Sequence, residues 1–239
     1  RVYCSTFCYN IDINLINIFQ KRIMNKKIPL DIANLPIYKS FKKSPYNSTK
    51  HLSYFHTYSE LLNKYRDKKI TFVEVGILDG GSLFMWRDFF GKKARIIGVE
   101  FNPAAKKWEK DGFEIFIGSQ SDEKFWDNFF KKIGSVDIIL DDGGHTNHQQ
   151  ITTVINCIKN IKNNGLLITE DTHSSYMRQF DNPSKYSFIN FTKKSIDDIN
   201  YKFPDIGYYK SSINNFVYSI EFFESIVAFK VNRERCEIN

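Results

Sequence analysis

Short apolar runs rich in β-branched residues alternate with helix-like segments from residue 70 onward, and this alternation constrains the fold more than any other feature. The runs lie at 70–76, 95–101, 113–118, 135–141 and 165–171. The segments between them, at 81–91, 103–110, 122–133 and 147–162, carry apolar residues at helical spacing. Each right-handed crossover helix returns the chain to the sheet in the same direction, so the strands must pair in parallel. The sequence therefore predicts a doubly wound α/β sheet.

The end of the chain follows a different pattern. After a helical region expected near 183–202, the sequence reads FVYSIEFFESIVAFKV over 216–231. These are two β-rich runs with only a short turn between them, which is typical of a hairpin. One late strand must then run against the others. We predict a mostly parallel, doubly wound α/β sheet of seven strands, in which the C-terminal hairpin supplies an antiparallel strand.

The chain length of 239 residues fits one α/β domain with an added terminal segment. Residues 1–45 are predicted to be a helical appendage or linker, because apolar residues within 11–19 have the spacing of one amphipathic helix and prolines follow at Pro29 and Pro36. Residues 46–239 are predicted to form the α/β domain, and the second half of 51–66 is expected to be helical.

Charge and cysteine content exclude several classes of protein. The formal charge of +7 comes from lysines scattered in doublets, not from a focused patch, which argues against a nucleic-acid groove. No apolar run is long enough for a membrane-spanning helix. The four cysteines lack CxxC spacing and a matching histidine cluster, so neither a zinc site nor a redox motif is indicated. We expect a soluble, cytoplasmic protein with reduced thiols.

Glycine and acidic residues end the first predicted strand, where a doubly wound sheet meets its ligands. The strand closes with Glu74 and Gly76, and the turn after it contains Gly80, Gly81 and Ser82 before a helix begins. Glycines at this place let the backbone approach a ligand that a β-carbon would exclude. A dinucleotide site normally requires GxGxxG, whereas this turn has the spacing GxxxGG, so NAD is the weaker candidate.

The second and third strands end in residues that suit a nucleoside. Glu100 lies 24 residues after Gly76, where an acidic side chain accepts hydrogen bonds from both hydroxyls of a ribose. Ser119 and Gln120 follow the third strand and are suited to the edge of a purine. Although each feature alone is ordinary turn chemistry, their occurrence at three successive strand ends predicts a nucleoside site.

Two pairs of carboxylates follow the fourth and fifth strands. Strand four runs into Asp141 and Asp142, and strand five into Glu170 and Asp171. Adjacent strands lie roughly 5 Å apart, and carboxylates that close oppose each other's ionisation unless a cation is present. Oxygen ligands suit a hard ion such as Mg²⁺. The alternative is that Asp142 caps the next turn while the other pair faces solvent. His145 follows on a glycine-flexed loop, and an imidazole suits a general base at neutral pH.

The strings VEVGILDGGSLFMWRDFF, GSQSD, DIILDDGGHTN and LLITEDTHSSY resemble the metal-dependent sugar O-methyltransferases that act on macrolide-antibiotic sugars, and their glycan-methylating relatives. The resemblance covers about 50–180 and implies a Rossmann-like, class I S-adenosylmethionine-dependent methyltransferase domain over 46–239. It also implies that Asp142, Glu170 and Asp171 hold Mg²⁺ or Mn²⁺, and that His145 is the base. The segment 1–45 does not match the additional domain of the macrolide enzymes.

The resemblance further implies a set of residues around S-adenosylmethionine, namely Tyr58, Glu74, Gly76, Gly80, Gly81, Ser82, Glu100, Ser119, Gln120 and Asp141. Asp142 and His145 would be the catalytic residues, with the hydroxyl of a sugar or glycan as acceptor. Two rival functions stay open. A nucleic-acid methyltransferase would explain the charge, but the (Asp/Asn)-Pro-Pro-aromatic string of amino-methylating enzymes is replaced by DDGGH. A non-catalytic glycan-binding domain on the same fold is the other. The chain could also be a domain of a larger protein that contains a glycosyltransferase, and it could form a homo-oligomer; both alternatives stay open.

Overall fold

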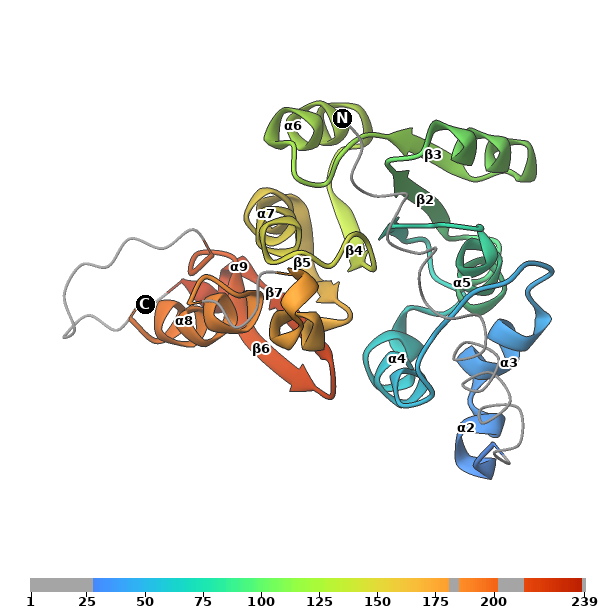
Figure 1. The fold of residues 1–239 in the computed structure, drawn as a ribbon, viewed down its shortest axis with the longest axis horizontal. Helices are drawn as coiled ribbons and strands as arrows, with labels where there is room; N and C mark the ends of the chain where they lie inside the picture. The colour runs from blue at the N-terminus through green and yellow to red at the C-terminus, as the bar shows by residue number, and fades with distance from the viewer. Residues whose placement is uncertain (1–27, 181–184, 202–212, 238–239) are drawn as a thin grey trace.

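The protein is described by a computed structural model that covers residues 28–180, 185–201 and 213–237 (Figure 1). These residues form a seven-stranded sheet with the order β3-β2-β1-β4-β5-β7-β6. The strands are β1 (Thr71–Val75), β2 (Arg95–Glu100), β3 (Glu114–Ile117), β4 (Val136–Asp141), β5 (Ile161–Thr169), β6 (Val217–Phe223) and β7 (Ile226–Val231). The first five pair in parallel, while β7 is antiparallel to both of its neighbours. The predicted fold is confirmed.

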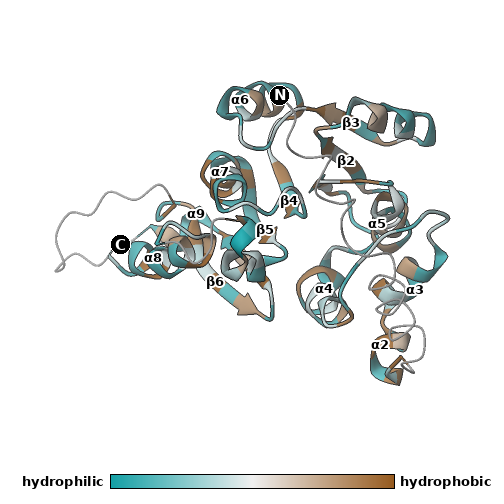
Figure 2. Cartoon of the chain, in the orientation of Figure 1, coloured by the Kyte–Doolittle hydropathy of each residue, from teal (hydrophilic) through white to brown (hydrophobic). Residues whose placement is uncertain are grey.

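Helices cover both faces of the sheet. On one face α4 (Tyr54–Leu62) and α5 (Gly81–Phe90) pack against alternate strand residues such as Phe72 and Ile138. On the other face α6 (Glu123–Ile133), α7 (Asn147–Cys157) and α8 (Phe188–Asn200) cover Val73 and Ile139. Because successive strand residues point to opposite faces, each strand contributes to both apolar clusters. Figure 2 shows the resulting hydrophobic colour of β2 and β3.

Two elements differ from the sequence prediction. The segment expected as a helix at 103–110 is a 3-10 helix, η2 (Pro103–Asp111), which begins at a proline and ends at Gly112 in a left-handed conformation. The helix expected to reach residue 162 stops with α7 and a short 3-10 turn, η3 (Ile158–Asn160), so that β5 begins earlier than expected. Gly165 lies within β5 and packs closely against β4. A β-carbon at this position would come 2.4 Å from the carbonyl oxygen of Asp137.

The segment before the sheet packs onto the domain. The helices α2 (Leu30–Asn34) and α3 (Pro36–Lys43) contribute Ile32 and Ile37 to the apolar cluster on the α5 face. Ser40 donates a 2.6 Å hydrogen bond to Asp88 on α5. The amphipathic helix predicted within 11–19 lies outside the described residues, and the division at residue 45 stays a prediction. None of the helices described is both long and apolar enough to span a membrane.

Candidate active site

The ends of β4 and β5 bring the two predicted carboxylate pairs together. Asp141 is in register with Thr169, and the backbone nitrogen of Glu170 donates a 2.9 Å hydrogen bond to the carbonyl oxygen of Asp141. Asp142 and Glu170 therefore leave the sheet side by side. The expectation that these strand ends are neighbours is confirmed, and a further cation lies between them.

That cation is the ammonium of Lys50, from the loop before α4. Its Nζ lies 2.6 Å from Oδ2 of Asp142 and 2.8 Å from Oε2 of Glu170, and its side chain is 1% exposed. Burial alone would lower the pKa of Lys50, but the carboxylates, above all Asp142 and Glu170, raise that pKa above its ordinary value. Burial in turn raises the pKa of Glu170 above its ordinary value, although the positive charge of Lys50 offsets part of the rise. Lys50 precedes Asp142 by 92 residues, so no local pattern predicted this pair.

Three ligand atoms converge beside this ion pair. One each from Asp142, His145 and Asp171 lie within 4.8 Å of one another. The Nε2 of His145 is 3.4 Å from Oδ2 of Asp171 and 3.8 Å from Oδ1 of Asp142. Oxygen ligands of this charge fit a divalent cation. Glu170 fits less directly, because its Oε2 accepts from Lys50 and its Oε1 accepts from the hydroxyl of Tyr58.

His145 and Asp171 are held in a left-handed backbone conformation, with φ of 57° and 54°. Such angles are uncommon outside glycine and are found where the surrounding structure fixes them. The hydroxyl of Ser174 donates a 2.9 Å hydrogen bond to the carbonyl oxygen of His145. The side chain of Gln150 similarly donates to the carbonyl oxygen of Glu170 at 3.0 Å. The Nδ1 of His145 is buried and has no hydrogen-bond partner among the described residues. The imidazole is thus positioned with one ring nitrogen facing the carboxylates.

Glu74, at the end of β1, is completely buried. Its two carboxylate oxygens accept hydrogen bonds from Ser82 at 2.7 Å and from Trp86 at 3.0 Å, both on α5. Burial raises the pKa of Glu74 to about 7, while the positive charge of Lys50 lowers it in part. Glu74 and Ser82 therefore bond to each other in this structure, and their predicted contact with a cofactor stays a prediction. The same holds for Tyr58, whose hydroxyl is directed at Glu170.

Glu100 organises the turn between β1 and α5. Its Oε2 accepts from the backbone nitrogens of Ile77 and Leu78 at 3.1 and 3.2 Å, and its Oε1 accepts from those of Phe101 and Asn102 at 2.8 and 3.0 Å. The side chains of Leu78 and Phe101 are 83% and 73% exposed. Two exposed apolar side chains thus belong to residues whose backbone nitrogens donate to Glu100. These contacts were not predicted from the sequence.

The glycines of the first turn allow close packing. A β-carbon on Gly76 would lie 2.2 Å from the carbonyl oxygen of Asp142, and the φ of Gly76 is 81°. A β-carbon on Gly80 would meet Trp108 at 2.3 Å, and one on Gly81 would meet the carbonyl oxygen of Asn47 at 2.2 Å. Gly76 therefore brings the end of β1 against the loop that carries Asp142.

The third strand end is tied to the same loop through Gln120. Its amide donates to Oδ1 of the buried Asp141 at 2.9 Å, and its oxygen accepts from the backbone nitrogen of Gly144 at 2.8 Å. Burial raises the pKa of Asp141 to about 6, and the bond from Gln120 lowers it in part. Ser119 accepts from the backbone nitrogen of Ser121. The residues predicted around a nucleoside thus share one edge of the sheet with the acidic site.

Several curated proteins match the central part of the chain. It is 26% identical over 160 residues to the 8-demethyl-8-alpha-L-rhamnosyl tetracenomycin-C 2'-O-methyltransferase of Streptomyces olivaceus, covering 62% of this chain and 42% of that protein. It is 29% identical over 132 residues to the mycinamicin VI 2''-O-methyltransferase of Micromonospora griseorubida, covering 52% and 32%. The chain is a homologue of sugar O-methyltransferases. No protein-family model matches it.

A solved methyltransferase structure shares the fold of this chain. The MycE methyltransferase of mycinamycin biosynthesis, solved in complex with Mg, S-adenosylhomocysteine and mycinamycin VI, superposes with a TM-score of 0.72 at 21% identity. The match covers 83% of this chain and 53% of MycE. At this identity the likeness shows the shared methyltransferase fold. The chain spans less than half the length of these two curated relatives.

Proposed function

We propose that this chain transfers the methyl group of S-adenosylmethionine to a sugar hydroxyl, with His145 as general base and a divalent cation, Mg²⁺ or Mn²⁺, at the neighbouring carboxylates. The observation that carries the proposal is the convergence of Asp142, His145 and Asp171 at one edge of a methyltransferase sheet. The homologues are named for methylation of sugars on polyketides and macrolides, which supports the same class of acceptor here.

In the proposed reaction the hydroxyl oxygen of the sugar forms a bond to the methyl carbon as the bond from that carbon to the sulfonium sulfur breaks. His145 accepts the hydroxyl proton, and S-adenosylhomocysteine leaves. A divalent cation at Asp142 and Asp171 would lower the pKa of a bound hydroxyl. The Nε2 of His145 lies 3.4 Å from Asp171, which is longer than a normal hydrogen bond and keeps this nitrogen available to a proton donor.

The cofactor is proposed to bind over the ends of β1, β2 and β3. Exposed Leu78 and Phe101 offer apolar surfaces to a purine, and Glu100, which accepts from the backbone nitrogens of both, is proposed to bind the ribose. A ribose hydroxyl would bond to Glu100 in exchange for, or in addition to, one of its backbone amides. The other proposed cofactor neighbours at the carboxyl ends of these strands and of β4 are Gly76, Ser119, Gln120 and Asp141. The proposed set also includes Tyr58, Glu74, Gly80, Gly81 and Ser82.

Glu170 is proposed as a third metal ligand that becomes available when Lys50 moves away. Cytoplasmic location is proposed because the described cysteines, Cys157 and Cys236, are buried free thiols. Fusion to a glycosyltransferase and self-association are retained as proposals about the whole protein, since the chain corresponds to only part of its relatives.

The test is transfer of labelled methyl from S-adenosylmethionine, with Mg²⁺ present, to a panel of defined oligosaccharides and glycosylated macrolides. Label on at least one sugar, lost in His145→Ala, supports the proposal. Cofactor binding without transfer to any sugar would favour the non-catalytic glycan-binding alternative. Transfer to RNA or DNA in preference to every sugar would favour a nucleic-acid methyltransferase.

A further inference from the structure

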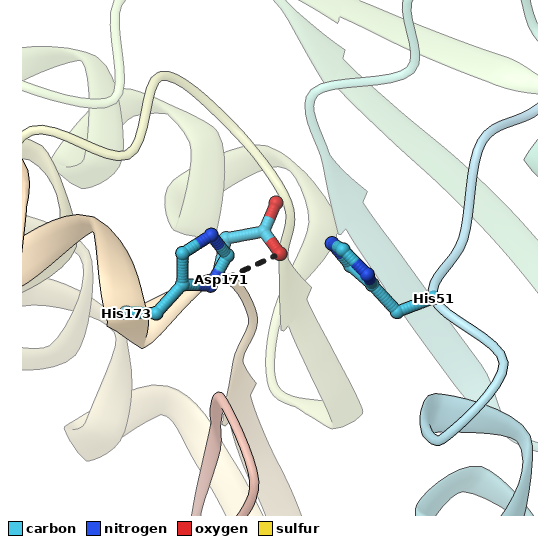
Figure 3. A group of neighbouring side chains, drawn as sticks. All are labelled: His51, Asp171 and His173. Carbon is cyan, nitrogen blue, oxygen red and sulfur yellow. Dashed lines mark ion pairs between the residues drawn. The ribbon is translucent and has the colours of Figure 1, made fainter. Parts of the chain in front are cut away.

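A second group of possible metal ligands flanks the acidic site. His51, Asp171 and His173 each offer a ligand atom, and these atoms lie within 4.8 Å of one another. Figure 3 shows the two imidazoles on either side of the Asp171 carboxylate. The histidines come from the loop before α4 and from the 3-10 helix η4 (Thr172–Tyr176), so tertiary folding brings them together.

Neighbouring side chains orient both imidazoles. The rings of His51 and His173 are edge to face, with centroids 5.8 Å apart, and the ring of His51 also contacts Tyr54 at 5.1 Å. The Nδ1 of His173 lies 2.5 Å from Oγ of Ser225, and the hydroxyl of Tyr54 donates to Oδ1 of Asp171 at 2.5 Å. A hydroxyl on one ring nitrogen and a phenol on the carboxylate are the kind of outer contacts that orient metal ligands.

The imidazole nitrogens of His51 are not hydrogen-bonded to other described residues. Within residues 28–180, 185–201 and 213–237 the residue makes ring contacts but no hydrogen bond through its side chain. It is exposed, and His173 is 47% exposed in its side chain. Exposure leaves room for water to complete a coordination shell, and it allows the small rotations that bring ligand atoms to the roughly 3.3 Å spacing of a tetrahedral zinc site.

We propose that His51, Asp171 and His173 bind a transition-metal ion such as Zn²⁺ at a site distinct from that of Asp142 and His145. Two imidazoles with one carboxylate suit Zn²⁺, Co²⁺ or Ni²⁺, whereas Mg²⁺ prefers oxygen ligands. Asp171 belongs to both groups, so an ion at the second site holds a carboxylate that the first site also uses. Binding of Zn²⁺ at the second site does not depend on the proposed methyl transfer. An effect of that ion on the first site, through the shared Asp171, rests on the proposed function.

The test is calorimetric titration of metal-free protein with Zn²⁺ near neutral pH, in wild type, His51→Ala and His173→Ala. Each variant is expected to bind Zn²⁺ at least about tenfold more weakly, as loss of a metal-site contact typically causes. His56→Ala is the matched control, because His56 is a half-exposed histidine on α4 that pairs with Asp31 at 3.1 Å, outside the cluster. His145→Ala separates the two sites and is expected to affect Zn²⁺ affinity less than either cluster variant.

The proposal is overturned if His51→Ala or His173→Ala retains wild-type affinity, or if His145→Ala weakens binding as much as they do. Thermal unfolding of each variant verifies that the fold is intact, which is expected for His51→Ala, His56→Ala and His173→Ala because these three residues are exposed. The visible absorption of bound Co²⁺ gives a second measurement, and it must change in both cluster variants and stay unchanged in His56→Ala. Neither measurement depends on turnover, so failure of the methyl-transfer proposal leaves this result interpretable.

Discussion

Lys50 and Glu170, 120 residues apart in the chain, form a buried ion pair in which Nζ lies 2.8 Å from Oε2. The same ammonium lies 2.6 Å from Asp142. A cation taken from water into such a site is stable only while its carboxylate partners are ionised. The acidic ends of β4 and β5 therefore contain one tethered positive charge, and this charge competes with any divalent ion for the same oxygens.

Replacement of Lys50 by methionine is expected to tighten binding of Mn²⁺ by about tenfold or more, because like charges within a few ångströms repel by more than the roughly 1.4 kcal/mol that a tenfold change requires. Titration followed by electron paramagnetic resonance, at one pH for all variants, measures this directly. Lys43→Met is the control, since Lys43 is 66% exposed and pairs with Asp88 on α5 at 3.2 Å, not with Asp142 or Glu170. Weaker Mn²⁺ binding in Lys50→Met would mean that the lysine supports the site instead of competing for it.

Glu74 predicts how stability depends on pH. Burial raises its pKa from the ordinary value of 4.5 to about 7, so the folded state holds a proton that the unfolded state has released between these values. Its contribution is then largest below pH 4.5 and is lost as pH rises toward 7. Between pH 4.5 and 7 the free energy of unfolding of the wild-type protein is expected to fall by about 3 kcal/mol relative to that of Glu74→Gln.

Urea unfolding of both proteins at several pH values measures that difference. Glu60→Gln, at an exposed position on α4, should instead remain parallel to wild type. Equal slopes for wild type and Glu74→Gln would contradict a neutral, buried Glu74.

Alanine variants at Gly76 and Gly134 distinguish the cost of a steric clash from the cost of backbone strain. Both have positive φ, but a β-carbon at Gly76 would lie 2.2 Å from the backbone of Asp142, whereas one at Gly134 would have nothing within 4 Å. Gly134→Ala is expected to cost about 2 kcal/mol from strain alone, because its φ of 75° and ψ of −162° lie in a region that only glycine adopts readily, and Gly76→Ala about 2 kcal/mol more. Denaturant unfolding gives both free energies. A similar cost for the two variants would show that the loop after β4 moves freely away from β1.

The sheet and the meeting of Asp142 with Glu170 could be predicted from the sequence, because strand periodicity and parallel crossovers are local signals with few outcomes. Lys50 could not be predicted, since its contacts join a loop to strand ends 92 and 120 residues later. The bonds of Glu74 to Trp86 and Ser82 depend on how α5 packs over β1. Residues 103–111 carry a helical pattern but form a 3-10 helix, a distinction that spacing alone does not resolve.

His145 and the carboxylates beside it are proposed to carry out methyl transfer. The most direct measurement is the rate of label transfer from S-adenosylmethionine to a sugar acceptor, with cofactor affinity measured by calorimetry on the same samples. His148→Ala, an exposed histidine at the start of α7, is the control. We predict that His145→Ala transfers methyl about a hundredfold more slowly or worse while it binds cofactor normally, and that EDTA abolishes transfer by the wild type. Full transfer by His145→Ala would show that His145 is not the base, and undiminished transfer in EDTA would show that no metal is required.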